Sequence, residues 1–457
     1  MRNYDVVVIG SGCGLSIVNE ALVHGLRVAL VDKGPLGGTC PNLGCIPSKM
    51  LIFPAERVAE IQEARKLGIE TDIRDIAFKS IMERMRKVVR ENREHLRREL
   101  SNLDNLDFYE GEGRFSGAHT VEVNGEEVQG DKVFIASGSR PLIPPIEGLK
   151  RADYLTNETV LQLRERPETL IIVGGGYVAV EYGHFFAVMG TKVTILEMAD
   201  RLVLSEEPEI AEMLKNEMSR RMSVHTGVQA EAVKSKGQDV TVVASDLASS
   251  GRKEFTAQKI LMAVGRKSNA DLLSVESTGV ELDKRGFVKV DEYLETTKKN
   301  IFAVGDINGQ QMFTHVANVE ASLAADNAIH GSKTKMDYSA APHAVYSHPQ
   351  IASVGMTEEA ARKAYKVLVG RARYSDVAQG QAMMEETGFA KAIVEADTGR
   401  ILGFHIIGPY APILIQEVIN AMASGGGINQ IQAGMHIHPA ITELIPTVLA
   451  NLSDKVS

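Results

Sequence analysis

The sequence predicts an α/β fold in which two modules of alternating strands and helices precede a C-terminal α+β domain. Length is the first observation, because 457 residues at roughly 150 residues per domain correspond to about three domains. The second is that the order strand, glycine turn, helix, strand occurs twice, in residues 6–31 and in residues 170–196. The third is a change of pattern from about residue 338, where strand-like runs lead into two helical stretches.

The first module begins at the N-terminus. Val6–Ile9 is a run of apolar, β-branched residues that ends at Gly10. Residues 12–24 have a helical pattern, and Arg27–Val31 is a second run typical of a buried strand. A strand, a helix and a second strand in this order open a βαβ unit.

A glycine cluster lies where the first strand meets the helix. Gly10 permits a tight turn, and Gly12 lets the backbone approach a pyrophosphate at the N-terminus of the helix. Asp32 follows Gly12 by 20 residues, where a carboxylate can accept a hydrogen bond from a ribose hydroxyl. Gly14 comes one position before the third fingerprint glycine, whose place Leu15 takes. This cluster alone fits a dinucleotide site or an ordinary βα turn, and Leu15 leaves the helix–strand packing open.

The second module repeats the plan. Leu170–Val173 and Lys192–Leu196 are predicted strands, and the turn Gly174–Gly176 leads into a predicted helix at Val178–Met189. Glu197 follows Gly176 by 21 residues. Two modules of this kind, each with its acidic residue, predict two Rossmann-like domains that bind two dinucleotides. A carboxylate at Glu197 can hold the 2′-hydroxyl of NAD and would repel the 2′-phosphate of NADP, so NAD is expected.

The remaining segments complete the expected order of elements. Residues 76–103 place apolar side chains at a helical period, which predicts an amphipathic helix. Residues 106–135 and 223–263 are predicted to form short strands joined by turns, one of them at Lys236–Asp239. The C-terminal part is predicted to contain strands at Ala344–Tyr346 and Ile351–Val354 and helices near 358–366, 412–424 and 440–452.

Composition excludes several classes of protein. A hydrophobic content of 44% and a charged content of 24% are ordinary for a globular chain. The net charge of −9 argues against a nucleic-acid partner, and the basic run at 84–98 is interleaved with glutamates, as on a solvated helix face. No stretch approaches the roughly 18 apolar residues of a membrane span, and the first residues lack a signal-peptide pattern. We therefore expect a soluble, cytoplasmic protein with no membrane partner.

Two of the three cysteines form the most informative pattern. Cys40 and Cys45 lie five residues apart in the segment Gly37–Lys49, beside the first nucleotide site. No histidine lies close enough in sequence to complete a zinc site, so no metal is expected, and inert buried thiols are the other alternative. We interpret the cysteines as a redox pair, because catalytic disulfides are the kind that occur in the cytoplasm. Pro47 predicts a helix that begins near Cys45, where the helix dipole and Lys49 favour a thiolate.

A histidine and a carboxylate near the C-terminus supply a candidate base. Thiol–disulfide exchange needs a group that takes up and returns a proton near neutral pH. Glu443 follows His438 by five residues and can hold the imidazole in one tautomer. His348 also precedes a proline, but the fifth residue after it is Ser353, so a structural role is expected there. His436 is the local alternative to His438.

These motifs together carry a resemblance. The segment Gly37–Lys49 resembles the active site of the flavin-dependent pyridine nucleotide–disulfide oxidoreductases, the family of dihydrolipoamide dehydrogenase, glutathione reductase, mycothione reductase and mercuric reductase. Other segments resemble the second FAD motif, the crossover turns of the flavin domain and the C-terminal His-Pro…Glu pair; these are Thr296 with Ile301–Asp306, Ala136–Gly138 with Val264–Arg266, and His438–Glu443. The resemblance covers nearly the whole chain.

The resemblance implies FAD in the first module and NAD in the second, with NADH preferred over NADPH. The implied domains are an FAD-binding domain over residues 1–148 with a helical excursion at 54–105, an NAD(P)-binding domain at 149–267, a second part of the FAD domain at 268–337, and a dimerisation domain at 338–457. The implied FAD contacts are Gly10, Gly12, Gly14, Asp32, Lys49, Gly138 and Asp306, and the implied NAD contacts are Gly174, Gly176, Tyr177, Glu197 and Gly265.

The resemblance also implies catalytic roles around the flavin. Cys40 would be the interchange thiol that meets the substrate, and Cys45 would be the thiolate that faces the flavin. Lys49 would lie near the reactive flavin nitrogen and pair with Glu181. Tyr177 would cover the nicotinamide side of the flavin.

The C-terminal pair would act across a dimer. In the family this domain forms the interface of a homodimer with active sites shared between subunits, and His438 with Glu443 would serve the disulfide of the partner subunit. The apolar helical stretches at 412–424 and 440–452 are consistent with such an interface. Cys13 matches no redox position and is expected to be a small packing residue in the glycine turn.

Two kinds of substrate remain open at this point. No cysteine follows Cys45, which excludes the C-terminal thiol pairs of mercuric reductase and of high-molecular-weight thioredoxin reductase. Glu197 and Gly37–Lys49 favour dihydrolipoamide dehydrogenase, acting on a small dithiol or a protein-bound lipoyl group. The alternative is an NAD(P)H-dependent reductase of a low-molecular-weight disulfide, because His438-Pro439-Ala440 looks closer to mycothione reductase. If the chain were a non-enzymatic flavoprotein, nothing would explain why Cys40 and Cys45 occur together with His438 and Glu443.

Overall fold

The structure is a computed structural model that describes residues 1–237, 239–249 and 251–454. The chain divides into two compact units. Unit 1 comprises Met1–Ser48, Met82–Leu142 and Gly265–Met336. Unit 2 comprises Lys49–Ile81, Ile143–Val264 and Asp337–Ser457. Each unit is described by itself.

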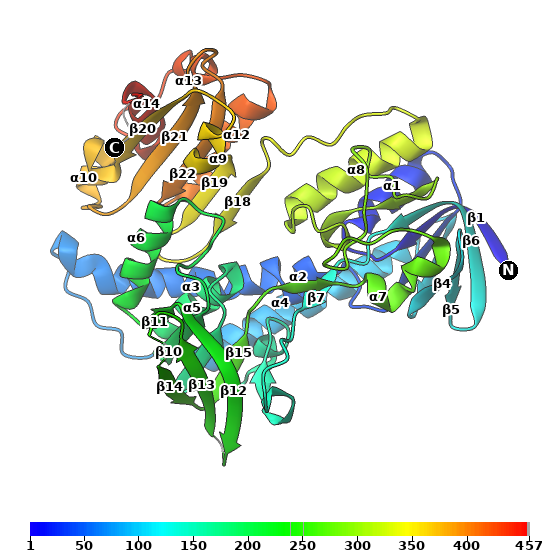
Figure 1. Cartoon of the computed structure of the whole chain (residues 1–457), viewed down its shortest axis with the longest axis horizontal. Helices are drawn as coiled ribbons and strands as arrows, with labels where there is room; N and C mark the ends of the chain where they lie inside the picture. Colours follow the sequence, from blue (N-terminus) through cyan, green and yellow to red (C-terminus); the bar gives the residue numbers. More distant parts are fainter. Residues whose placement is uncertain (238, 250, 455–457) are drawn as a thin grey trace. The chain divides into compact units, whose positions relative to one another are not determined.

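Unit 1 is built on a seven-stranded sheet (Figure 1). The strand order is β3-β2-β1-β6-β5-β4, and β17 also pairs with β6. The strands are β1 (Arg2–Ile9), β2 (Val28–Asp32), β3 (Leu106–Glu110), β4 (Gly113–Gly117), β5 (Thr120–Val123), β6 (Glu126–Ile135) and β17 (Ile301–Ala303). The pairs of β1 with β2 and β6, of β2 with β3 and of β6 with β17 are parallel, whereas β4, β5 and β6 pair antiparallel. The parallel part is the sheet of a dinucleotide-binding domain.

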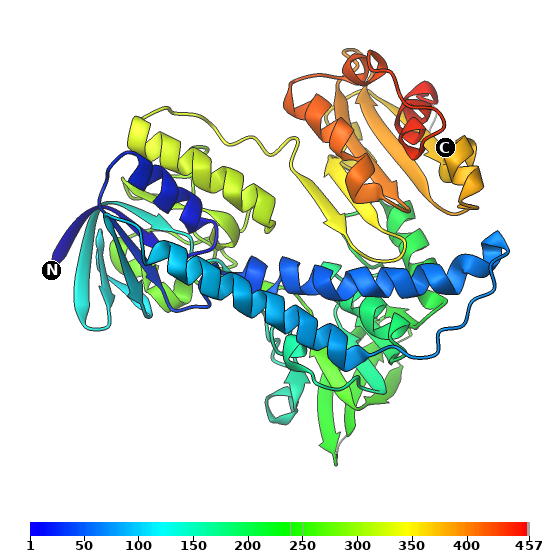
Figure 2. The same ribbon diagram turned by 180° about the vertical axis from the view of Figure 1, so that it is seen from behind.

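The apolar run in β1 is continuous because both faces of this strand are buried. Val6 and Val8 pack on one face with residues of α1 (Gly14–Val23) and α8 (Thr314–His330). Val7 and Ile9 belong to the core on the opposite face. Both ribbon views show α1 and α8 side by side over the sheet (Figures 1 and 2). The first and last helices of this unit therefore form one layer.

Two short strands pair where the chain leaves and re-enters unit 1. β7 (Ser139–Pro141) and β16 (Arg266–Ser268) pair antiparallel, so the segments on which the chain leaves and re-enters this unit are hydrogen-bonded to each other. The expected crossover turns lead directly into this ribbon. The helices that complete the unit are α2 (Thr39–Leu43), the start of α3 (Cys45–Glu63), most of α4 (Phe78–Leu100), α7 (Ala270–Leu273), and the 3₁₀ turns η4 (Val275–Thr278) and η5 (Gly305–Ile307).

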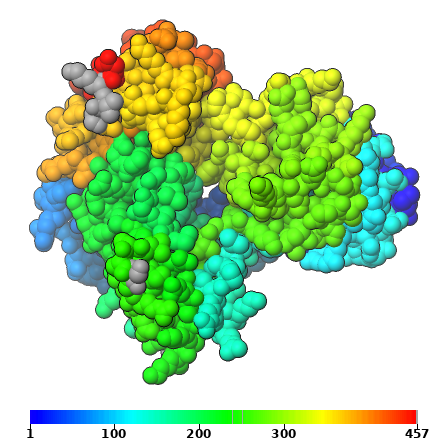
Figure 3. Space-filling view, in the orientation of Figure 1, coloured from blue at the N-terminus to red at the C-terminus, as the bar shows by residue number. Residues whose placement is uncertain are grey.

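Unit 2 contains a second parallel sheet with the order β11-β10-β9-β15-β8. Its elements are β8 (Tyr154–Leu155), β9 (Thr169–Val173), α5 (Tyr177–Val188), β10 (Lys192–Glu197), α6 (Pro208–Ser219), β11 (Ser223–Thr226) and β15 (Lys259–Met262). An antiparallel ribbon of β12 (Val228–Lys236), β13 (Asp239–Asp246) and β14 (Arg252–Ala257) accompanies it. In the space-filling view this ribbon is the bright green lobe at the lower edge (Figure 3).

The rest of unit 2 is an antiparallel five-stranded sheet with helices. The strand order is β18-β19-β22-β21-β20, with bounds Pro342–Val345, Ile351–Gly355, Ile401–Ile407, Phe389–Glu395 and Val367–Arg373 in that order. One face is covered by α11 (Ala411–Leu414), α12 (Gln416–Ala423), α13 (Ile428–Gln432) and α14 (Leu444–Ala450). The opposite face carries α9 (Glu358–Arg362) over a smaller apolar cluster. α10 (Ala378–Ala382) follows β20.

The predicted fold class is confirmed, with two Rossmann-like sheets and a C-terminal α+β part. The helical excursion expected at 54–105 begins earlier, at Cys45, because the redox segment itself opens α3. The stretch expected to be helical at 440–452 is a 3₁₀ turn, η7 (Ile441–Glu443), followed by the shorter α14. The expected turn at Lys236–Asp239 includes residue 238, which lies outside the described residues. Within the described part of the chain, no helix combines the length and apolarity that a bilayer crossing requires. The exact domain boundaries stay predictions.

Candidate active site

The first glycine turn requires glycine at two positions for different reasons. Gly10 has a φ of +108°, and a Cβ there would lie 2.3 Å from the Ala136 carbonyl oxygen. A Cβ on Gly14 would lie 2.8 Å from Val8 Cγ1. Gly14 is therefore the glycine that allows α1 to pack closely on β1, and Leu15 does not disturb that packing.

Asp32 lies beside this turn, at the end of β2. Its carboxylate accepts hydrogen bonds from the backbone N–H of Ser11, at 2.5 Å, and of Gly34, at 2.6 Å. Nearby, the buried Ser137 hydroxyl makes no hydrogen bond within the described chain, although buried polar groups are normally satisfied. A glycine turn, an anchored carboxylate and an unsatisfied hydroxyl fit a dinucleotide such as FAD. They leave its ribose and phosphate contacts as predictions.

The second predicted FAD segment comes close to the crossover ribbon. Asp306 accepts a hydrogen bond from Ser139 Oγ, and Arg266 Nε lies 3.3 Å from an Asp306 oxygen. Gly138, with a φ of +65°, and Gly265, with a φ of +124°, sit at the two ends of this ribbon. The structure thus groups Asp306 with both crossover turns, which sequence places more than 120 residues apart.

The cysteine segment is held against the first glycine turn. The Gly37 N–H donates to Ser11 Oγ at 2.8 Å, and a Cβ on Gly38 would lie 2.7 Å from Gly12 Cα. The buried Asn42 side chain stabilises the segment by donating to the Gly38 carbonyl oxygen at 2.8 Å. The redox segment and the first nucleotide turn therefore form one continuous site.

Within this site the two cysteines occupy different positions. Cys45 begins α3, as Pro47 predicted, so it lies at the positive end of the helix dipole. Its Sγ lies 3.5 Å from the hydroxyl of Thr314, the first residue of α8. A hydrogen bond with Cys45, followed by burial, raises the pKa of Cys40 above its ordinary value. Both residues are free cysteines in this structure.

Lys49 and Glu181 form an ion pair. Lys49 Nζ lies 2.8 Å from Glu181 Oε2, and only 10% of the Glu181 side chain is exposed. The Tyr346 N–H donates to the same carboxylate at 3.1 Å, and Lys49 Nζ lies 4.5 Å from the centre of the Tyr346 ring. Lys49 is thus held in one place by a charge and an aromatic ring.

The second glycine turn carries its acidic residue directly alongside. Gly174 has a φ of +112°, and a Cβ on Gly175 would lie 2.7 Å from Glu197 Cγ. Glu197 Oε1 accepts a hydrogen bond from the Ala199 N–H at 2.6 Å. A Cβ on Gly176, which caps α5, would meet no atom of the described chain within 4 Å. Open space at a helix N-terminus beside a carboxylate fits a nicotinamide dinucleotide.

Tyr177 begins α5 and is held by groups that the sequence analysis did not find. Its hydroxyl lies 2.6 Å from Ser205 Oγ and donates to Glu206 at 3.4 Å. The His343 ring stacks on the Tyr177 ring at 5.7 Å and its Nε2 lies 2.7 Å from Glu206. Burial and then the Glu206 charge raise the pKa of the Tyr177 hydroxyl, so it stays neutral. No local pattern marks Glu206 or His343, because they are separated by 137 residues.

His438 and Glu443, near the C-terminus, lie within hydrogen-bonding distance of each other. His438 Nδ1 lies 2.9 Å from Glu443 Oε1, and the Ala440 N–H donates to the other Glu443 oxygen. The hydrogen bond with His438, and then the bond from Ala440, lower the pKa of Glu443. His438 is 73% exposed, which leaves the rest of its ring accessible. The neighbouring His436 is engaged with Glu417 at 2.9 Å.

Two residues that the sequence analysis set aside have structural contacts. His348 lies 2.8 Å from Glu63. Cys13 packs beside Gly305, and its Sγ lies 4.0 Å from the Val304 carbonyl oxygen. Burial, followed by the charge of Glu320, raises the Cys13 pKa to about 12, so this thiol stays protonated.

Comparison with known proteins decides the family. Residues 4–321 match the family described as pyridine nucleotide-disulphide oxidoreductase. The chain belongs to this family. Residues 341–449 match the dimerisation domain of pyridine nucleotide–disulfide oxidoreductases. The chain is therefore an oxidoreductase of a family that depends on FAD and NAD(P)H and acts on sulfur groups, as the motifs predicted.

Several members of the family are similar over nearly the whole chain. A mycothione reductase of Mycobacterium tuberculosis is 35% identical over 99% of this chain and all of its own length. A dihydrolipoyl dehydrogenase of Geobacillus stearothermophilus is 33% identical, covering 96% of this chain and 94% of its own. Among solved structures, the HOCl-induced flavoprotein disulfide reductase RclA of Escherichia coli superposes with a TM-score of 0.84 and 28% identity, covering 98% of this chain and 99% of that one. These similarities leave the substrate open.

Proposed function

We propose that this oxidoreductase is an NAD-linked dihydrolipoamide dehydrogenase that works through a Cys40–Cys45 disulfide. The observation that carries the nucleotide assignment is Glu197, whose side chain lies against the Gly175 turn. The Ala199 N–H holds this carboxylate in place. It can accept a bond from a ribose 2′-hydroxyl, and its charge opposes a 2′-phosphate. NAD specificity favours a lipoamide enzyme over the NADPH-dependent reductases.

The thiol chemistry follows from the cysteine positions. In the oxidised protein, one substrate thiolate attacks Cys40 Sγ, and Cys45 leaves as a thiolate at the start of α3. The second substrate thiol then attacks the substrate sulfur of the mixed disulfide and releases Cys40 as a thiolate. The two substrate sulfurs are then joined in the disulfide of oxidised lipoamide. Bound FAD supplies the transfer of two electrons between the dithiol and NAD⁺. The reverse order of thiol steps reduces a disulfide.

His438 supplies the proton transfer in this proposal. With Nδ1–H donated to Glu443, the neutral ring presents Nε2 as the basic nitrogen. Nε2 takes the proton of a substrate thiol and returns it in the reverse direction. Glu443 is a positioning residue, because its two oxygens hold the ring and the Ala440 backbone at once.

We place Lys49 and Tyr177 on the two sides of the flavin. Lys49, fixed by Glu181, would direct its positive charge to the reactive nitrogen of the flavin. Tyr177, kept neutral by burial, would shield the ring until the nicotinamide enters.

The active site is proposed to be shared between the subunits of a homodimer. The chain contains the family's dimerisation domain at residues 341–449. An isologous dimer would use this surface twice and generate two equivalent sites. In each site, His438 of one subunit would serve the disulfide of its partner.

One alternative is favoured by a specific observation. The 35% identity with mycothione reductase extends over the full length of both chains, and Ala440 follows the His438-Pro439 pair. A reductase of a low-molecular-weight disulfide would use the same cysteines and histidine in the reductive direction.

A substrate and nucleotide panel tests the proposal. Dihydrolipoamide oxidation is measured with NAD⁺ and NADP⁺, and the disulfides of lipoamide, glutathione and mycothiol are tested with NADH and NADPH. We expect the highest kcat/KM for dihydrolipoamide with NAD⁺. Faster reduction of another disulfide, or a preference for the phosphorylated nucleotide, would replace the proposal by the alternative.

A further inference from the structure

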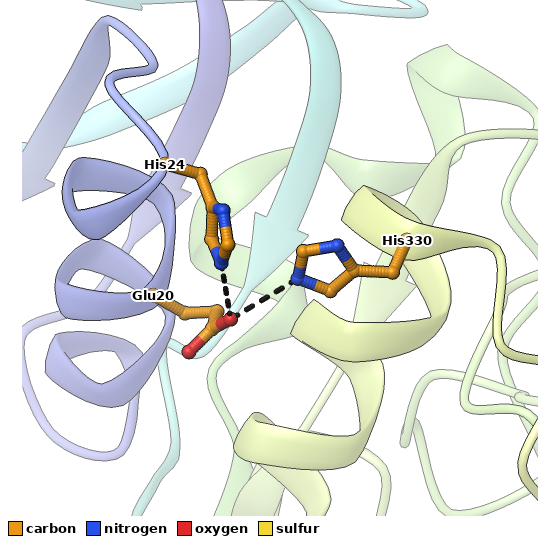
Figure 4. Close-up of side chains that lie close together, drawn as sticks. All are labelled: Glu20, His24 and His330. Carbon is orange, nitrogen blue, oxygen red and sulfur yellow. Dashed lines mark hydrogen bonds and ion pairs between the residues drawn. The ribbon is translucent and has the colours of Figure 1, made fainter.

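A cluster of two histidines and one glutamate lies in unit 1, on the helices that cover the first sheet. Glu20 lies in α1, His24 follows directly after α1, and His330 is the last residue of α8 (Figure 4). One potential ligand atom from each residue lies within 4.8 Å of those of the other two. The first nucleotide turn and the redox pair use none of these three side chains.

Both imidazoles converge on the same carboxylate oxygen. His24 Nε2 lies 3.1 Å from Glu20 Oε1, and His330 Nε2 lies 3.2 Å from the same atom. Ligands about 2.0–2.1 Å from a tetrahedral zinc ion stand about 3.3 Å apart. The two nitrogen–oxygen spacings therefore already match two edges of a zinc coordination tetrahedron, and the third, between the two imidazole nitrogens, lies within 4.8 Å.

The helix ends supply a second reason for a cation. α1 ends at Val23 and α8 ends at His330, so the C-terminal ends of both helices meet at this cluster. A helix C-terminus carries partial negative charge and favours a cation within its last turn. No lysine or arginine occupies the last turn of either helix.

A second cluster of potential metal ligands, made of three carboxylates, already contains a cation of the chain. Glu207, Glu209 and Glu358 also come together, but the Lys391 ammonium already lies 2.7–2.8 Å from each carboxylate. That cluster carries its own cation from the chain. The histidine cluster, in contrast, offers two imidazole nitrogens and a carboxylate.

We propose that Glu20, His24 and His330 bind a divalent transition-metal ion of the zinc type at the ends of α1 and α8. Two imidazoles and one carboxylate are a donor set that suits zinc better than magnesium or calcium. The three side chains are 34–43% exposed, so water completes the coordination.

The ion would act as a clamp between two helices of the flavin-binding unit. α1 begins at the glycine turn with Gly14, and α8 begins at Thr314, which contacts Cys45. The helices pack together along their length through shared apolar residues. A metal bridge at their far ends would oppose separation of the two elements that flank the redox centre, and this role is independent of the identity of the substrate.

Zinc binding to the FAD-loaded protein tests the proposal. Cys40 and Cys45 are first replaced by serine, because thiols bind zinc themselves. Zinc retained after equilibrium dialysis is then measured by atomic emission, together with Tm with and without zinc. We expect one zinc ion per chain more in this background than after a further H24A/H330A change, and a zinc-dependent rise of Tm only in the former.

Two single variants separate a metal site from a pair of hydrogen bonds. Glu20→Gln keeps a hydrogen-bond acceptor for both histidines but removes the anionic ligand, and we expect zinc affinity to fall by at least about tenfold. His95→Ala is the matched control, because His95 forms a similar exposed pair with Glu99 at 3.1 Å; it should retain zinc. Equal zinc content in the background protein and the H24A/H330A variant, or no zinc in either, would overturn the proposal.

Discussion

Lys391 holds together three carboxylates from two parts of unit 2, and its replacement by methionine should destabilise the chain. Its side chain is 1% exposed, and its Nζ lies 2.7 Å from Glu207 and Glu358 and 2.8 Å from Glu209. Glu207 and Glu209 flank the start of α6 in the second nucleotide module, whereas Lys391 lies on β21 of the C-terminal sheet. Lys391→Met keeps an unbranched side chain that is one atom shorter, and it removes the ammonium with its charge and its contacts to the carboxylates.

The magnitude follows from how much water each carboxylate can reach. Glu207 is 2% exposed, whereas Glu209 and Glu358 are 32% and 18% exposed and can be partly hydrated. Removing one partner of a buried ion pair costs about 3–5 kcal/mol. Because only one of these carboxylates is fully buried, we expect about 3 kcal/mol. At about 2–4 °C per kcal/mol for a unit of this size, Tm should fall by about 6–12 °C.

Arg371 lies 2.7 Å from Glu209 and Arg362 lies 2.7 Å from Glu358, so these two carboxylates keep a cation without Lys391. Among the described residues, Glu207 would be left beside His405. His405 Nε2 lies 3.8 Å from Glu207, but burial lowers the pKa of His405, so the ring is neutral near pH 7. Burial by itself would raise the pKa values of Glu209 and Glu358, but the hydrogen bonds and charges of Lys391 and the neighbouring arginines together outweigh it and hold both values below the ordinary range.

The sign of the pH dependence follows from these lowered pKa values. The stabilisation is fully present above the ordinary carboxyl pKa of about 4.3, and it is lost as the pH falls through the lower pKa values of the folded protein. The difference in Tm between wild type and Lys391→Met should therefore persist from pH 7 down to about pH 5 and shrink as the pH falls below about 4.

The assay is thermal unfolding of the FAD-loaded proteins, followed by circular dichroism at several pH values. Lys363→Met is the matched control, because Lys363 pairs with Glu359 at the same 2.7 Å distance but on the surface, with 72% and 80% exposure. Exposed ion pairs contribute little to stability, so the control should have the same Tm as wild type. A Lys391→Met protein that melts within about 2 °C of wild type, below the drop of about 6–12 °C expected, would refute the reasoning.

Three further predictions concern the proposed function. Cys45→Ser should retain FAD, measured by its absorbance, and lose turnover of dithiols and disulfides; normal turnover would contradict the role of the cysteines. Glu197→Arg should narrow or reverse the NADH/NADPH ratio of kcat/KM, by about tenfold for each ~1.4 kcal/mol of altered binding, and a wild type that already prefers NADPH would make this assignment wrong. Mixed dimers of Cys45→Ser and His438→Ala subunits, isolated with two affinity tags, should recover about half of the wild-type activity, because one shared site collects both changes and the other neither; activity no higher than in the two homodimers would exclude shared sites.

The sequence by itself determined the parts of the site whose residues lie close together in the chain. Gly10 and Asp32 belong to one βαβ unit, and the spacing of Cys40 and Cys45 lies within a single turn and helix start. These features are set by backbone conformation and element order over a few residues to about twenty, so a one-dimensional pattern records them. The pairing of His438 with Glu443 is local for the same reason.

Only the tertiary structure decided how the remaining groups meet. Cys45 and Thr314 are 269 residues apart, and Tyr177 receives Glu206 and His343 from two different elements. No periodicity links such residues, because their proximity depends on which sheet faces and helix ends are packed against each other. The same holds for the histidine cluster, where residues 20 and 330 are brought together by the packing of α1 on α8.

The packing of Gly14 separates what the sequence indicates from what only the tertiary structure decides. The sequence revealed that the third fingerprint glycine is replaced by Leu15, which left the close contact of helix and strand undecided. The structure shows that Gly14 makes this contact, with Val8 Cγ1 2.8 Å from where a Cβ would lie. The spacing of a motif can shift by one residue when the rotation of the helix places another small residue against the sheet, and that rotation is a property of the packed fold.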